Sequence, residues 1–216
     1  MRPRLRQLQV TGQLFIRTFS ALSANPHIKV YQLATLPPSY LLSLIESNSP
    51  SFTTSLGTTT ELPPTPRSFV ANDRFMAILN DVLGKYAAQD DGLKAQALAF
   101  AAPGGTIFGN AGSSHSRSSS PTQQGSGGGG VGGWVHLSDL RNPPDFGRIA
   151  WPEDILGSVE VDNAGNLLDN FQPSGSYRIL TNEGILGLSD FLRGKLVERL
   201  KQEDEIDDSE RPQLLD

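Results

Sequence analysis

The stretch from Trp134 to Asp162, WVHLSDLRNPPDFGRIAWPEDILGSVEVD, gathers the residue types that carry out acid–base chemistry. The candidate residues in it are His136, Asp139, Arg141, Asp145, Glu153 and Asp154. A base that is oriented by a carboxylate is the usual arrangement for proton transfer. His136 with Asp139 or Asp145 is therefore the candidate pair of a small hydrolase or lyase.

The same stretch also has a purely structural interpretation, which we favour. Pro143-Pro144 and Trp151-Pro152 impose extended or turn geometry, because proline restricts its own φ and the conformation of the residue before it. Aspartate and asparagine side chains satisfy backbone groups in such segments. Arg141 and Arg148 can pair with the acids or stack on Trp151. This interpretation accounts for the charges without catalysis, and we expect no catalytic, cofactor-binding or metal-ligating residue.

The composition narrows the chemistry further. The chain has no cysteine, which excludes disulfides, thiolate zinc sites, iron–sulfur ligation and a cysteine nucleophile. Of the three histidines, only His136 lies outside the N-terminal region and the Ser/Gly-rich insert described below, and one is too few for a histidine-rich zinc centre. A carboxylate-only magnesium or calcium site stays open, although the spacing matches no EF-hand loop. We therefore expect no cofactor.

The N-terminus predicts a mitochondrial transit peptide over residues 1–26. Four arginines, Arg2, Arg4, Arg6 and Arg17, precede the first carboxylate of the chain, Glu46. An arginine-rich, hydroxyl-rich and acid-free beginning is typical of such leaders. The stretch from Arg17 to Ser20 is similar to a matrix-processing motif, with cleavage near Phe19 or Ser20. Removal of four arginines would change the net charge from -5 to -9. A basic helix docked on the domain and a plastid leader are the alternatives.

Beyond the leader, the sequence predicts one small α+β domain in two parts, residues 27–102 and 134–201. Residues 103–133 are rich in Ser and Gly and predict a disordered linker, and the acidic residues 202–216 predict a disordered tail. A G-x-G-x-x-G match at Gly125 lies in this linker. Because it lacks a strand before it and a helix after it, it predicts no dinucleotide site.

A few short strands and three to four helices are expected. The clearest helix begins after Asn72 and places apolar residues at steps of three and four up to Tyr86. The other expected helices are residues 39–46, 93–102 and a final helix capped by Ser189. The expected strands are residues 27–33, 134–137, 157–161 and 177–180, with a turn at 163–166 and a loop or linker at 47–67.

Two runs, GWVHLSDLRNPPDFGRIAWPEDILGSVEVD and SYRILTNEGILGLSDFLRGKLVERL, resemble a group of uncharacterised fungal mitochondrial proteins that have a similar presequence and a similar low-complexity insert. The resemblance covers most of the chain. It implies a mitochondrial location and no particular activity.

The leading functional expectation is a non-catalytic accessory or assembly factor of the mitochondrial matrix that acts through protein–protein contacts. Trp134, Trp151 and Arg141 are the expected interface anchors. A negative net charge disfavours direct binding of nucleic acid, and the apolar runs are too short to cross a membrane. The alternatives are the His136 hydrolase or lyase and a mitoribosome-associated protein that binds protein components only.

Overall fold

The computed structural model describes residues 17–33, 38–47, 50–102, 132–145 and 148–210. These residues form three α-helices and ten strands in antiparallel sheets, which confirms the α+β fold class. In the described part of the chain, no helix combines the length and the apolar character that a membrane span needs.

The N-terminal half forms a five-stranded antiparallel meander in the order β1-β2-β3-β4-β5. Its strands are β1 (Arg17–Leu22), β2 (Asn25–Leu33), β3 (Ser39–Ser43), β4 (Gly57–Thr59) and β5 (Phe69–Ala71). The central strands are buried on both faces, because Val30 and Leu42 join the main core while Tyr31, Leu33 and Leu41 form a small second cluster.

A three-stranded antiparallel sheet in the order β6-β7-β8 follows, made of β6 (Gly133–Ser138), β7 (Ile155–Val161) and β8 (Leu167–Pro173). The expected turn between β7 and β8 is confirmed. Asp162 accepts hydrogen bonds from the backbone of Ala164 and Asn166, and Gly165 takes a φ of +87° that other residues rarely adopt. Gly165 also lies against α2, where a Cβ would come within 3.1 Å of Ala101.

The three α-helices are α1 (Asp73–Tyr86), α2 (Asp91–Ala101) and α3 (Asp190–Glu210). Two short 3₁₀ turns are η1 (Ala87–Gln89) and η3 (Pro152–Asp154). A two-stranded hairpin consists of β9 (Leu180–Thr181) and β10 (Gly184–Ile185). Asn72 caps α1 through the backbone N–H of Arg74, as expected. Asp90 caps α2 and Ser189 caps α3 in the same manner.

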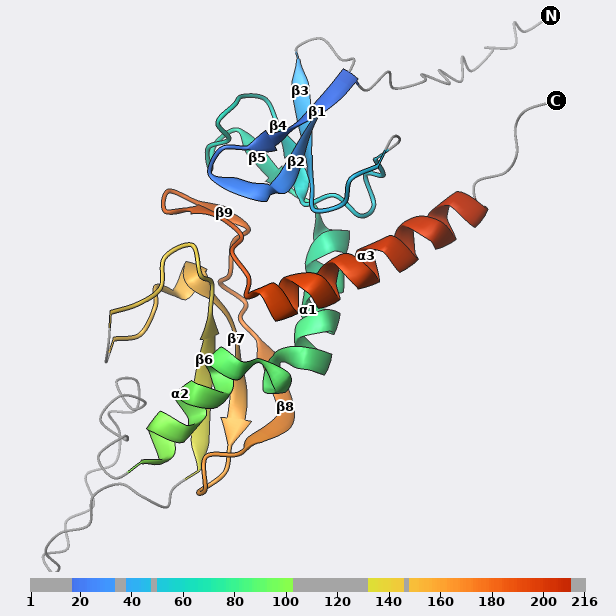
Figure 1. The fold of residues 1–216 in the computed structure, drawn as a ribbon. Helices are drawn as coiled ribbons and strands as arrows, with labels where there is room; N and C mark the ends of the chain where they lie inside the picture. The colour runs from blue at the N-terminus through green and yellow to red at the C-terminus, as the bar shows by residue number, and fades with distance from the viewer. Residues whose placement is uncertain (1–16, 34–37, 48–49, 103–131, 146–147, 211–216) are drawn as a thin grey trace, which may run out of the picture.

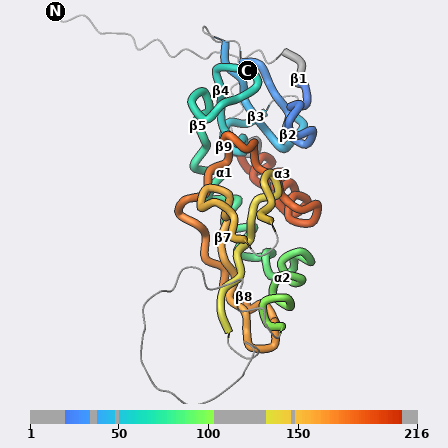
Figure 2. The backbone as a smooth tube through the Cα atoms, turned by 90° about the vertical axis from the view of Figure 1, so that its left-hand side faces the viewer, coloured from blue at the N-terminus to red at the C-terminus, as the bar shows by residue number. Residues whose placement is uncertain are grey.

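The two parts of the domain share one hydrophobic core. Buried apolar residues of the meander, the three helices and the three-stranded sheet form a single cluster, with Phe75, Leu79 and Leu196 fully buried. The five-stranded sheet lies at one end of the molecule, α1 and α3 cross the middle, and the three-stranded sheet with α2 lies at the other end (Figures 1 and 2). Residues of both segments, 27–102 and 134–201, therefore contribute to this core.

The structure differs from the sequence prediction at the N-terminal boundary. Strand β1 begins at Arg17 and pairs with β2, so the expected boundary at residue 27 falls inside a strand. Leu22 is buried in the core, which is why this segment belongs to the sheet. The expected cleavage near Phe19 would cut β1. Residues 1–16, which carry most of the expected leader, lie outside the described residues.

Residues 39–46 are not a helix as expected. Ser39–Ser43 form strand β3, and Leu41 to Ile45 are all buried. A short run that is buried on every side lacks the periodicity that separates a helix from a strand. The expected loop at 47–67 also contains β4 and the fully buried Leu56.

The acidic tail expected from residue 202 is helical up to Glu210. Glu203 is buried between Arg74 and Arg199, and Thr54 donates a hydrogen bond to Asp204, so the charges contact the rest of the chain. The expected disordered linker at 103–133 lies almost wholly outside the described residues, and β6 already begins at Gly133.

Candidate functional site: a buried arginine–aspartate cluster

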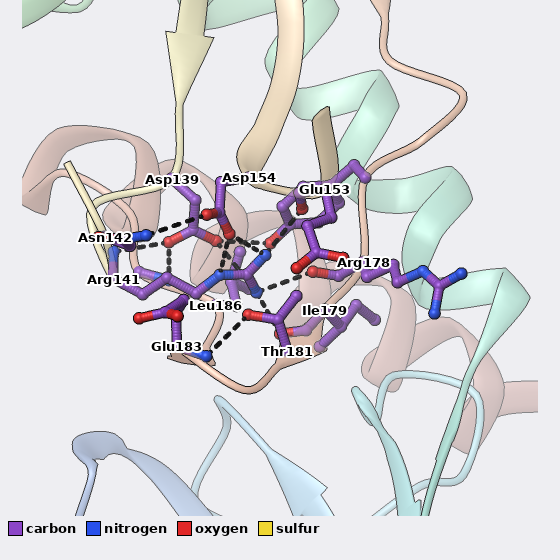
Figure 3. Close-up of polar contacts among 12 residues, drawn as sticks. Asp139, Arg141, Asn142, Glu153, Asp154, Arg178, Ile179, Thr181, Glu183 and Leu186 are labelled. Atoms are coloured by element: carbon purple, nitrogen blue, oxygen red, sulfur yellow. Dashed lines mark hydrogen bonds and ion pairs between the residues drawn. The ribbon is translucent and has the colours of Figure 1, made fainter. Parts of the chain in front are cut away.

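Three charged residues of the opening stretch, Asp139, Arg141 and Asp154, meet in one buried cluster (Figure 3). Asp139 follows directly after β6, and Arg141 lies in the turn beyond it. Asp154 ends the 3₁₀ turn η3, and Tyr177 comes from the loop between β8 and β9. Asp139 and Asp154 are completely buried, and the side chain of Arg141 is 3% exposed.

Arg141 and Asp154 form the central ion pair. Nε and Nη2 of Arg141 both lie 2.7 Å from Oδ1 of Asp154, and the amide of Asn142 lies 3.4 Å from Oδ2. Charge-assisted contacts of this length are about twice as strong as neutral hydrogen bonds. The sequence prediction that Arg141 pairs with the neighbouring acids is therefore confirmed.

The remaining donors of Arg141 hold two other segments. Nη1 donates to the carbonyl oxygens of Arg178 and Ile179 at 2.8 and 2.9 Å, and Nη2 donates to the carbonyl of Glu153 at 2.8 Å. One guanidinium therefore ties the 139–142 turn, the 3₁₀ turn and the chain before β9 together.

Asp139 is satisfied by the backbone and by Tyr177. Its Oδ1 accepts from the backbone N–H groups of Arg141 and Gly187, both at 2.8 Å, and its Oδ2 accepts from the hydroxyl of Tyr177 at 2.7 Å. Burial raises the pKa of Asp139, against the opposing effect of Arg141 and these hydrogen bonds. Burial and the neighbouring Asp139 raise the pKa of Tyr177 well above its ordinary value. The hydroxyl of Tyr177 therefore stays protonated and donates a hydrogen bond to Asp139.

Gly187 is required at the back of this cluster. A Cβ at this position would lie 2.8 Å from the backbone nitrogen of Arg141 and 3.1 Å from Oδ1 of Asp139. Only glycine allows the two backbones to approach so closely. Tyr177 and Gly187 both lie far along the chain from Asp139, so the sequence pattern does not identify either as a site residue.

The side chains of the cluster hold the 139–142 turn, η3 and the chain before β9 to one another. Its polar groups are engaged with one another, and no buried side-chain nitrogen or oxygen in the described residues lacks a hydrogen-bond partner. Nor do the described residues contain a group of three or more histidines and carboxylates suited to a metal ion.

The structure does not bring the expected catalytic pair together. In β6, Val135 and Leu137 face the core while His136 lies on the other face, where its Nδ1 is 2.8 Å from Oγ of Ser158. Burial lowers the pKa of His136, which favours the neutral imidazole at neutral pH. Asp139 faces Tyr177 instead, and Asp145 is exposed.

The expected interface anchors have different environments. Trp151 is 70% exposed, and Leu140 and Ile149 in the same segment are 54% and 41% exposed. Trp134 is half-buried. Arg141 is not an interface anchor, because its side chain is buried and its donors are engaged within the chain.

Comparisons with protein-family models, with curated proteins and with solved structures found no match to this chain.

Proposed function

We propose that this protein is a non-catalytic accessory or assembly factor of the mitochondrial matrix that binds a protein partner through the exposed side chains of Leu140, Ile149 and Trp151, in the described segments 140–145 and 148–151. The observation that supports it is the environment of Trp151. This large aromatic side chain is 70% exposed, although it lies three residues before the fully buried Asp154.

The buried cluster explains how such a segment can bind well. An irregular loop that is ordered only on binding loses part of its interaction energy to ordering, by about 0.5–1.5 kcal/mol for each immobilised side chain. Here both ends of the segment are already held, through Asp139 and Arg141 on one side and Asp154 on the other. The backbone next to Trp151 is therefore held in place before a partner binds.

The residue types on the segment favour a protein as the partner. Tryptophan is enriched among the few residues that dominate binding energy, and three large apolar side chains of one segment are exposed here, Leu140, Ile149 and Trp151. The net charge of -5 disfavours nucleic acid. The arginine-rich N-terminus supports the mitochondrial location.

The test compares Trp151→Ala with a control, Val70→Ala, which removes an equally exposed apolar side chain from β5 on the other sheet. Each variant carries a tag and is purified from mitochondria after chemical cross-linking. We expect a defined partner to be recovered with the wild type and with Val70→Ala, and at least tenfold less with Trp151→Ala. Equal recovery with both variants, or a tagged protein found only in the cytosol, would count against the proposal.

One contact favours a second candidate, a small hydrolase or lyase based on His136. Its hydrogen bond to Ser158 joins a neutral imidazole to a hydroxyl, which is the first half of a nucleophile–base arrangement. The test replaces His136 by Ala in cells that depend on respiratory growth. Full growth with a folded variant would end the catalytic case for this residue, and loss of growth shared by Ser158→Ala would support it.

A further inference from the structure

A pocket of about 290 Å³ lies between the five-stranded sheet and α3. One wall comes from β2 and the segment after β3. The other wall comes from α3, where Arg193, Val197 and Lys201 follow one another at steps of four and so share a helix face. The volume suits a small ligand.

The pocket is cationic in an otherwise acidic chain. Lys29, Arg193 and Lys201 line it together with one carboxylate, Glu46, so three positive charges against one negative charge leave an excess of two. The whole chain carries -5. Arg193 also pairs with Asp190 at 2.7 Å, but this carboxylate is 94% exposed and the contact involves only Nη2. An exposed pair of this kind is weak and leaves other guanidinium donors for a ligand.

The base of the pocket is apolar and held in place. Leu44 and Ile45 are buried and Val197 is half-buried. The hydroxyl of Tyr31 donates to the carbonyl of Ile45 at 3.1 Å and accepts from the backbone N–H of Ser47 at 2.9 Å. These bonds fix the wall before any ligand arrives, which lowers the cost of binding.

We propose that this pocket binds a small phosphorylated molecule that carries an apolar group. A phosphate monoester has close to two negative charges at neutral pH, and its oxygens suit the guanidinium of Arg193 and the ammonium group of Lys201. The apolar group lies against Leu44 and Val197. This site is independent of the Trp151 segment and of the protein contacts proposed for it.

The test is a titration of the full chain followed by amide chemical shifts, with phenyl phosphate, inorganic phosphate and benzoate as probes. Phenyl phosphate is expected to bind most tightly, because it combines the dianion with the ring, and to shift the amides of Lys29, Ile45, Val197 and Lys201. If benzoate binds as tightly as phenyl phosphate, the proposal that the ligand is a phosphate is refuted. No saturable binding of any probe, or shifts confined to another face, would overturn the site itself.

Variants separate the charges from the apolar base. Arg193→Gln combined with Lys201→Gln is expected to weaken phenyl phosphate at least tenfold. Lys195 lies on the same helix, but its side chain does not line the pocket. Lys195→Gln is therefore expected to change the affinity for phenyl phosphate less than twofold. Val197→Ser is expected to weaken phenyl phosphate but not inorganic phosphate. Equal weakening by Lys195→Gln would mean that only the overall charge matters and would refute the proposal.

Discussion

Replacement of Arg141 by methionine is the sharpest test of the role assigned to the buried cluster. Methionine keeps much of the length and the apolar stem of arginine but removes the charge and all five N–H donors. The variant leaves Asp139 and Asp154, both completely buried, without their cation. It also removes the side-chain donor to the carbonyl groups of Glu153, Arg178 and Ile179, although the carbonyls of Glu153 and Ile179 keep a backbone donor.

The expected loss of stability is large. Removing one partner of a buried ion pair costs about 3–5 kcal/mol, because the remaining charge stays buried without compensation. A domain of ordinary stability has about 5–15 kcal/mol in total, so the loss is a substantial part of it. With a urea dependence of about 2 kcal/mol per molar, the unfolding midpoint would fall by about 2 M.

The loss should also depend on pH. In the wild type burial already raises the pKa of Asp139, against the opposing effect of Arg141. Without Arg141 the pKa rises further, so the folded variant takes up protons. A carboxyl whose pKa is raised in the folded state contributes stability below its unfolded pKa and loses that stability as the pH rises through the folded value. The difference between variant and wild type is therefore greatest near neutral pH and narrows in acid.

The assay is urea unfolding followed by circular dichroism, with Arg178→Met as the matched control. The side chain of Arg178 is exposed and points away from the cluster, although its carbonyl accepts from Arg141 (Figure 3). We expect the control to change the free energy of unfolding by less than about 0.5 kcal/mol. A loss below about 1 kcal/mol for Arg141→Met, or equal losses for the two variants, would refute the account of the cluster.

Three further substitutions are each expected to change stability in a definite direction. Burial favours a higher pKa for Glu203, but hydrogen bonds and charges from Arg74 and Arg199 outweigh it and hold the pKa below its ordinary value of 4.5. Glu203→Gln should therefore cost about 1 kcal/mol at pH 7, and this difference should vanish as the pH falls through the lowered pKa, measured by urea unfolding across pH. Gly165→Ala should destabilise the protein by about 1–2 kcal/mol, because its φ is +87°, whereas Gly194→Ala in α3 has open space around it and should stabilise by about 1 kcal/mol in thermal unfolding.

The sequence predicts the elements whose signal is local. The helix after Asn72 carries its own cap and an apolar stripe, and it is confirmed as α1. The strands at 134–137 and 157–161 alternate in burial and are confirmed as β6 and β7. In these elements neighbouring residues alone specify which face is apolar, so no distant partner is needed to predict them.

The sequence does not predict the elements that depend on contacts with residues far along the chain. Ser39–Ser43 form a strand because β2 and β4 lie on the two sides of this segment. The acidic end of α3 is ordered because Arg74, 129 residues away along the chain, reaches Glu203. A run of acidic residues by itself predicts a solvated tail. The helix forms here because residues from other parts of the chain contact these acids.

The candidate site divides in the same way. The pairing of Arg141 with nearby aspartates follows from local composition, and the structure confirms it. The contact of Tyr177 with Asp139 spans 38 residues, and the approach of Gly187 depends on the β9–β10 hairpin that precedes it. Because no alternation or spacing links these residues, only the folded chain identifies them as one cluster.

The central claim is that Trp151 contacts a partner inside mitochondria, and the native mass of the protein tests it most directly. Tagged wild-type chain and Trp151→Ala are each released from mitochondria and sized by gel filtration with light scattering. We predict that the wild type elutes in a complex well above its own 23.3 kDa and that Trp151→Ala elutes as the free chain. A wild type that elutes only at 23.3 kDa, or a Trp151→Ala variant that stays in the same complex, would contradict the account.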